Sequence, residues 1–384
     1  MSPGTAPGRP PESGAGACRA CIAHSLLLAS LGGVLDRCSG DRGRFLDLLA
    51  LEGEALIAAI GGRRSQELHR QLRDMLSGEL PVAADARSLC RHDPRYPAAL
   101  HEPNAPRMLY LTCGPARLQL LTTAPVVAIA GAGRCSDYGA EVSRSLARGL
   151  AAAGVTVAAG LGDRLSRAAH EGVLEAQGAS IAVATCGSDR AFSARSRVLL
   201  AGVRLRGCVL SELPRDYPSR RWTVQAAHRV LGELAGVLVV VEAQESPRDL
   251  ALCGVARARG RTVAAVPGRV TSPLSAGSHR LLLDGASLVR GPGDVLELLS
   301  AASGSDAGAG CDRAGPGAAG RALPPDRLDR RLRSVLEAVG AGDGTPEEVS
   351  RGGVSAGQAL LALSELELLG MVVRGAGGRY LPRL

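Results

Sequence analysis

The chain has 384 residues, of which 46% are hydrophobic and 21% are charged. This composition excludes a largely disordered chain and, with the length, predicts two to three globular domains. The net charge is +8 at pH 7, carried on the basic side by arginine alone because the sequence has no lysine, and it favours an anionic partner. With one Trp, five Tyr and two Phe, a surface built mainly of aromatic stacking platforms is excluded.

The first residues and the apolar runs bear on location. Residues 1–16 are polar and rich in Pro and Gly, which predicts a disordered tail and no secretion signal. The longest apolar runs are shorter than a membrane span, so we expect no membrane insertion. The ten cysteines are scattered, and a cytoplasmic protein with reduced thiols is the expectation.

Residues 17–85 form the first structured segment. Apolar residues recur there at spacings of three and four, interrupted by glycine, which predicts a small module of three to four short helices. Cys18, Cys21 and His24 form a C-x2-C-x2-H sequence, with Cys38 nearby. This spacing is compatible with zinc, but the fourth ligand is distant and no second C-x-x-C follows. The sequence therefore predicts no metal site.

Residues 86–299 have a different sequence pattern, in which short apolar runs alternate with helical stretches. This pattern predicts an α/β fold with βαβ units and a parallel, Rossmann-like sheet covered on both faces. Ligands of such sheets bind at the carboxyl ends of the strands. Within it, residues 125–299 carry 21 arginines against 15 acidic residues, so the basic excess lies in this core. The expected strands are 126–131, 155–160, 180–185, 208–212, 237–243 and 262–268.

The C-terminal part predicts a linker and a small domain. Residues 300–325 are rich in Gly, Ala, Ser and Pro, as linkers are. Residues 326–384 predict helices at 327–339, 346–350 and 355–369, followed by a hairpin, the pattern of a winged helix. Residues 352–373 contain no arginine but carry Glu365 and Glu367. A helix that reads DNA has to neutralise phosphates, which a helix with only acidic charges cannot do. We therefore expect this domain to contact protein and not DNA.

Glycine-rich turns follow the first two core strands. Gly131, Gly133 and Arg134 lie after the first strand, where backbone amides and the next helix N-terminus can hold a phosphate. Ser136 replaces the third glycine of the dinucleotide fingerprint, and the next strand ends without an acidic residue, so NAD binding is disfavoured. The alternative is a tight turn with a solvated arginine.

Further basic and polar residues follow the later strands. Residues 218–229 give either a basic ridge for phosphates or a solvated helix face with Trp222 in the core. No Ser-His-Asp or Cys-His arrangement can be built, so no catalytic residue is expected. The candidate phosphate contacts are Gly131, Gly133, Arg134, Gly160, Arg164, His170, Arg220, Arg221, His228, Arg229, Ser278 and His279.

Several short motifs occur in the order found in one family. The first motif, a proline followed by Leu-Tyr and then a glycine, is found at Pro106, Leu109, Tyr110 and Gly114. The others are S-E-x-P at 211–214, V-V-E-A at 240–243, G-R-x-V-x-A-V-P-G at 260–268 and D-G-A at 284–286. On these residues the chain, over about 20–384, resembles the bacterial DNA-processing protein A family (DprA, also called Smf).

The resemblance implies an extended Rossmann-like core flanked by a SAM-like helical module and a winged helix. It implies a homodimer that binds single-stranded DNA in a basic pocket, protects it and passes it to a RecA-type recombinase in natural transformation. It implies no cofactor and no catalysis. The chain departs from the family's R-N-R motif at residues 227–229 and loses the Asp of another at Ser166, while Arg164 and Arg248 are new.

Two alternatives stay open from the sequence. The first is a degenerate scaffold that keeps the fold and the dimer but has lost DNA binding. The second is a nucleotide-binding enzyme of the phosphoribohydrolase type, whose P-G-G-x-G-T-x-x-E motif is absent after Pro267 and Gly268. If instead the chain binds single-stranded DNA as the resemblance implies, Arg134→Ala and Arg229→Ala are each expected to weaken binding and its salt dependence.

Overall fold

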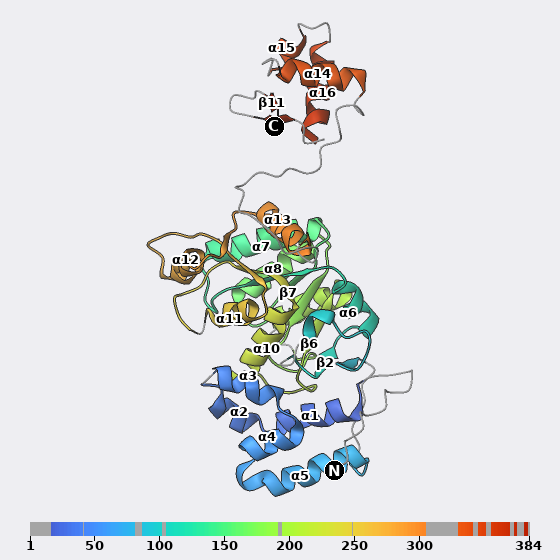
Figure 1. Cartoon of the computed structure of the whole chain (residues 1–384), viewed down its shortest axis with the longest axis vertical. Helices are drawn as coiled ribbons and strands as arrows, with labels where there is room; N and C mark the ends of the chain where they lie inside the picture. Colours follow the sequence, from blue (N-terminus) through green and yellow to red (C-terminus); the bar gives the residue numbers. More distant parts are fainter. Residues whose placement is uncertain are drawn as a thin grey trace, which may run out of the picture. The chain divides into compact units, whose positions relative to one another are not determined.

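The structure is a computed structural model (Figure 1), in which the chain divides into two compact units, residues 1–308 and residues 309–384. Each unit is described by itself. The described residues are 17–40, 42–80, 87–101, 105–190, 194–247, 249–304, 329–340, 345–350, 355–368, 372–374 and 380–382. The expected tail at 1–16 and all but the first five residues of the expected linker lie outside them. Residues 300–304 are part of a helix, so a linker beginning at residue 300 is wrong.

The N-terminal segment is helical, as predicted, but its described residues form five α-helices where three to four were expected. Its core is made mostly of leucines, and it includes Trp222 and Ala226 from the α/β core. The two parts therefore share one apolar interior within the first unit. The helices described here are α1 (Arg19–Ser30), α2 (Gly32–Cys38), α3 (Arg42–Ala50), α4 (Gly53–Ile60), the 3-10 turn η1 (Gly62–Arg64) and α5 (Ser65–Ser77).

The core is a nine-stranded sheet of order β1-β2-β6-β5-β4-β3-β7-β8-β9. The seven strands β3 to β9 are all parallel. At one edge, β2 pairs antiparallel with β6, and β1 pairs antiparallel with β2. All six predicted strands are confirmed. The strands are β1 (Ser88–Cys90), β2 (Met108–Leu111), β3 (Val126–Ala130), β4 (Val157–Ala159), β5 (Ser180–Val183), β6 (Cys208–Ser211), β7 (Ala235–Val240), β8 (Thr262–Ala265) and β9 (Ser287–Leu288).

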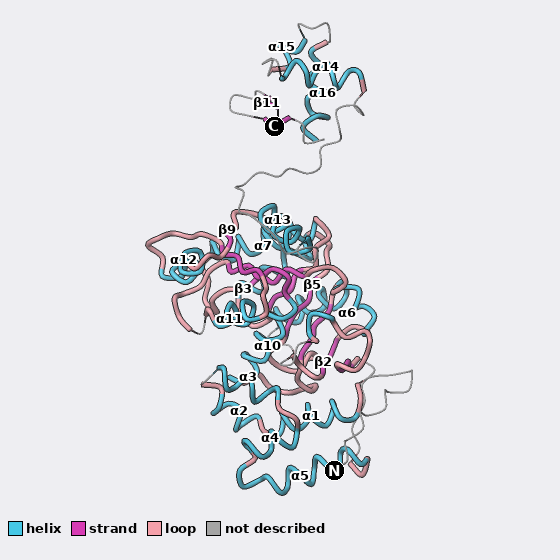
Figure 2. The backbone as a smooth tube through the Cα atoms, viewed as in Figure 1, coloured by secondary structure: helices cyan, strands magenta, loops and turns pink. Residues whose placement is uncertain are grey.

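Helices cover both faces of the sheet, which Figure 2 shows between them. Alternate residues of β3 explain this: Val127 and Ile129 pack with α7, α8 and α13, whereas Val126 and Ala128 pack with α6, α10 and α11. The remaining elements of the core are α6 (Pro115–Leu121), α7 (Asp137–Ala152), α8 (Arg164–Glu175), α9 (Ala194–Arg206), α10 (Arg221–Leu234), α11 (Ala251–Ala258), α12 (Ala276–Leu283), α13 (Pro292–Gly304) and the 3-10 turns η2 (Ala98–Leu100) and η3 (Pro273–Ser275).

The second unit has the predicted order of three helices and a hairpin. These are α14 (Arg330–Gly340), α15 (Pro346–Ser350), α16 (Ala356–Leu368) and the antiparallel strands β10 (Val372–Arg374) and β11 (Tyr380–Pro382). Glu365 forms an ion pair of 2.7 Å with Arg331. Among all the described helices, no single one is long and apolar enough to cross a membrane; α1 and α2 reach that length only together, with a 68° bend between them.

Candidate nucleic-acid interface

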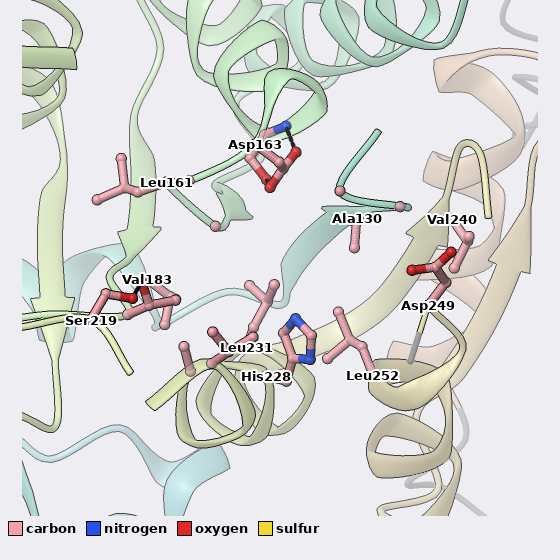
Figure 3. A pocket seen from close by; sticks show the side chains of 18 of the residues that line it. Ala130, Leu161, Asp163, Val183, Ser219, His228, Leu231, Val240, Asp249 and Leu252 are labelled. Atoms are coloured by element: carbon pink, nitrogen blue, oxygen red, sulfur yellow. Dashed lines mark hydrogen bonds between the residues drawn. The ribbon is translucent and has the colours of Figure 1, made fainter. Parts of the chain in front are cut away.

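A cavity of about 370 Å³ lies at the carboxyl edge of the parallel strands (Figure 3). Residues that end or follow β3, β4, β5 and β7 line it, together with α10 and α11. Its size falls in the range of small-ligand sites. Gly131, Gly133, Gly160 and His228, four of the predicted residues, line this cavity, at the strand ends where the topology places a ligand.

The lining chemistry differs from a phosphate cradle. Leu161, Leu231 and Leu252 contribute to apolar walls, and in Figure 3 His228 lies beside Leu231 and Leu252, across the cavity from Asp163. Among the described lining residues there is no arginine. The polar groups are Asp163, Ser166, Thr185, Ser219, His228 and Asp249. All six groups can accept a hydrogen bond and two of them are carboxylates, so the cavity suits a group that donates hydrogen bonds better than it suits a phosphate.

The N-terminus of α7, the expected phosphate site, already holds a carboxylate. Glu242 follows β7 and is 3% exposed. Its two carboxylate oxygens accept from the Ser136 backbone N–H at 2.8 Å and from the Ser136 hydroxyl at 2.6 Å. A Cβ on Gly139 would lie 2.3 Å from one of them, so this glycine makes room for the carboxylate. The favourable end of the helix dipole is therefore occupied by the protein itself.

Two more helix N-termini beside the cavity are capped in the same way. Asp163 accepts from the backbone N–H and the hydroxyl of Ser166 at 2.8 and 2.7 Å at the start of α8. Asp36 of α2 accepts from the backbone N–H of Trp222 at 3.1 Å at the start of α10. Each of these carboxylates engages one of the amides that a helix N-terminus offers, so negative charge already stands at these helix ends and disfavours a phosphate there.

Arginine side chains line a wider groove that adjoins the cavity. Arg37, Arg220 and Arg221 line this groove of about 1180 Å³. Val224 and His228 line both the groove and the cavity, so the two hollows meet along α10. Arg37 and Arg221 are exposed, and the Arg220 side chain is 41% exposed although it pairs with Asp36 at 3.3 Å. The groove thus places guanidinium groups beside a cavity whose described lining has two carboxylates and no arginine.

Arg229 does not belong to an exposed basic ridge, and that expectation is wrong. Its side chain is 2% exposed and its Nη2 donates to both carboxylate oxygens of Glu212, at 2.7 and 2.6 Å. Trp222, on the same face of α10, is fully buried. This face therefore packs inward, and Arg229 neutralises a buried carboxylate instead of meeting a solvent-borne phosphate.

Other predicted contacts also lie away from the cavity. His170 is fully buried, its Nε2 lies 3.0 Å from the Gly160 carbonyl oxygen, and burial lowers its pKa. Arg164 pairs with Asp137 in a separate cleft of mixed charge between α7 and α8.

On α12, Ser278 is buried and His279 hydrogen-bonds the backbone of Gly268. Arg134 is exposed on the loop directly after Gly133. Arg248 lies outside the described residues. The structure therefore gathers the glycines, Arg220, Arg221 and His228, and it separates the others.

Some lining residues were missed from the sequence. Thr185 and Asp249 follow predicted strands, so their position at strand ends was a usable signal. Asp36 and Arg37 carried no such signal, because they lie on a helix of the N-terminal segment whose docking partner only the folded chain reveals.

An open α/β fold with a ligand-sized cavity at the strand ends and an arginine groove beside it defines a Rossmann-like protein. Residues 87–300 match the family model described as DNA recombination-mediator protein A. The chain belongs to this DprA/Smf family.

Similar curated proteins and a solved structure agree with this family. A putative DNA processing protein DprA of Mycobacterium tuberculosis is 36% identical over 67% of this chain and 64% of its own length. Protein Smf of Escherichia coli is 30% identical over 66% of each chain. The structure of DNA processing protein A from Streptococcus pneumoniae aligns with a TM-score of 0.57 and 25% identity, over 72% of this chain and 97% of that one. The chain spans just under two thirds of the mycobacterial relative.

Proposed function

We propose that this protein binds single-stranded DNA without a catalytic step and acts in DNA processing for recombination. The observation that carries the proposal is the continuity of the arginine groove with the cavity along α10. Membership of a DNA-processing family, and relatives named for DNA processing, support it. The N-terminal helical segment is proposed to be a SAM-like module and the second unit a winged helix that contacts protein.

In this proposal the groove binds phosphates and the cavity binds a base. Arg37, Arg220 and Arg221 in the groove, and Arg134 on the loop beside the cavity, would pair with successive phosphates. A base turned out of the strand would enter the cavity, where apolar walls and acceptors such as Asp249 suit a base that presents amino groups. Duplex DNA keeps its bases stacked and cannot use the cavity, so single strands should bind more tightly.

Assembly is part of the same proposal. A homodimer would place two such grooves on one particle, and transfer of the strand to a RecA-type recombinase would use protein surfaces outside the groove. Location in the cytoplasm follows from this role.

The proposal is tested with a fluorescent oligonucleotide and the full chain across a salt series. Arg37→Ala with Arg221→Ala should weaken binding and reduce the slope of log K against log salt by about 1.4, at about 0.7 for each lost phosphate contact to a single strand. Arg117→Ala is the matched control, because Arg117 is exposed on α6 and lines a hollow at the opposite edge of the sheet.

The cavity needs its own variant. Ser219 is exposed and lines the cavity, so Ser219→Leu should narrow the cavity, lower the affinity for single strands and leave the salt slope unchanged. Equal, weak binding of single and double strands that no groove variant alters would overturn the proposal and favour a scaffold without DNA binding.

A further inference from the structure

Three cysteines and a histidine converge where the first helix meets the edge of the sheet. Cys18 precedes α1 and Cys21 lies in its first turn, whereas Cys90 ends β1 and His92 follows it. The four potential ligand atoms lie within 4.8 Å of one another. The His92 Nδ1 is 3.4, 3.5 and 3.9 Å from the sulfurs of Cys18, Cys21 and Cys90.

These distances match the edges of a metal-centred tetrahedron. With zinc–sulfur bonds of about 2.3 Å and zinc–nitrogen bonds of about 2.0–2.1 Å, tetrahedral angles place sulfur and nitrogen about 3.6 Å apart and two sulfurs about 3.8 Å apart. The three nitrogen–sulfur distances scatter around the first value, and the 4.8 Å limit accommodates the second. The four side chains are thus arranged as ligands around one centre.

The surroundings favour thiolates and a permanent ion. The backbone N–H of Cys18 points to the Cys90 sulfur at 3.4 Å, and the positive end of the α1 dipole lies beside Cys18 and Cys21. Cys21 and Cys90 are buried in an apolar cluster with Met108. These cysteines are free thiols, so no disulfide competes for their sulfurs in this state.

We propose that Cys18, Cys21, Cys90 and His92 hold one zinc ion that fixes α1 to strand β1. Three sulfurs and one imidazole suit zinc and exclude the oxygen-seeking Ca²⁺ and Mg²⁺. Four protein ligands leave no open position, which defines a structural site.

The expectation of no metal, and of His24 and Cys38 as the nearest further ligands, is replaced by this set. His24 instead hydrogen-bonds the Leu51 carbonyl oxygen at 2.9 Å. Cys38 ends α2 and is not part of the cluster.

The experiment is elemental analysis of the full chain, purified without a polyhistidine tag and without chelators. We expect about one zinc per chain, in line with a structural site. Cys90→Ser and His92→Ala should each lose most of the metal. Cys38→Ser should keep it, and it is the matched control because Cys38 is a half-buried cysteine of the same helical segment.

Measurements on the unaltered chain keep the test independent of folding of the variants. Mercurial modification of the thiols should release the zinc stoichiometrically. Replacement by Co²⁺ should give the visible bands of a tetrahedral ion with thiolate charge-transfer absorption. A metal-free chain with all these thiols reactive, bound iron in place of zinc, or a Cys18–Cys21 disulfide in the purified protein would each overturn the proposal.

Discussion

The buried pair of Arg229 and Glu212 separates a structural from a DNA-binding role. Their side chains are 2% and 5% exposed, and one guanidinium nitrogen reaches both carboxylate oxygens. Arg229→Met keeps much of the side-chain volume but leaves the carboxylate buried without this partner. Breaking such a pair from one side costs about 3–5 kcal/mol of the free energy of unfolding. At about 2–4 °C per kcal/mol, the melting temperature should fall by roughly 6–20 °C.

The assay is guanidinium or thermal unfolding of four chains: the unaltered chain, Arg229→Met, Glu212→Leu and the double variant. Because replacing both charges removes the unmatched group, the double variant should recover most of the lost stability. The salt slope of oligonucleotide binding, measured below the melting transition, should be the same for Arg229→Met as for the unaltered chain. An unchanged unfolding midpoint in Arg229→Met together with a flatter salt slope would refute this assignment.

Three further predictions follow from other contacts. Burial, with a smaller contribution from Arg107, lowers the pKa of His24 to about 4. Because the unfolded chain binds that proton at higher pH, stability is complete above about pH 6.5 and falls by up to about 3 kcal/mol toward pH 4. In urea titrations at several pH values, the free energy of unfolding of His24→Gln should lack this part of the pH dependence. Parallel plots of that free energy against pH for the variant and the unaltered chain would contradict the prediction. Gly139→Ala should destabilise the chain in thermal melts, because the new Cβ meets the Glu242 carboxylate; a gain in stability, as for an ordinary helical glycine, would contradict this. Asp36→Ala should cost about 0.5–2 kcal/mol by uncapping α10, yet raise oligonucleotide affinity by releasing Arg220; lower affinity in a folded variant would contradict it.

The parallel core was predictable because its strands are continuous apolar runs. Val126–Ala130 and Ala235–Val240 are buried on both faces. A strand of this kind is a continuous apolar run, which can be recognised from the local sequence without knowing its neighbours in the sheet. Strands β1, β2 and β9 were missed. They have two to four residues each, and β1 and β9 lie at the edges of the sheet. Strands β1 and β2 join the sheet antiparallel, outside the βαβ alternation on which the prediction rested.

The face of α10 shows where sequence reasoning about the site failed. Trp222 and Arg229 are seven residues apart and therefore lie on one side of the helix, but this spacing does not say which way that side faces. A fully buried tryptophan settles the direction, and the arginine follows it inward to Glu212. Polar character alone misled the prediction, because a buried arginine with a carboxylate partner has the same sequence signature as a solvated one.

The proposed zinc site could not be predicted from the sequence for a different reason, because its ligands come from two distant segments. The two halves of the proposed zinc site, Cys18 with Cys21 and Cys90 with His92, are about 70 residues apart. Each half is an unremarkable short spacing. Their meeting depends on α1 docking beside β1, which is a tertiary event that no local pattern encodes.

The capping of three helix N-termini by Glu242, Asp163 and Asp36 bears most directly on function. In a nucleotide-binding Rossmann fold these amides hold the ligand's phosphate. Here a free nucleotide would meet a protein carboxylate at each of these helix ends, whereas under the proposed function a strand would place its phosphates on arginines of the adjoining groove. If the strand is held by side chains in this way, affinity should grow with strand length and fall steeply with salt.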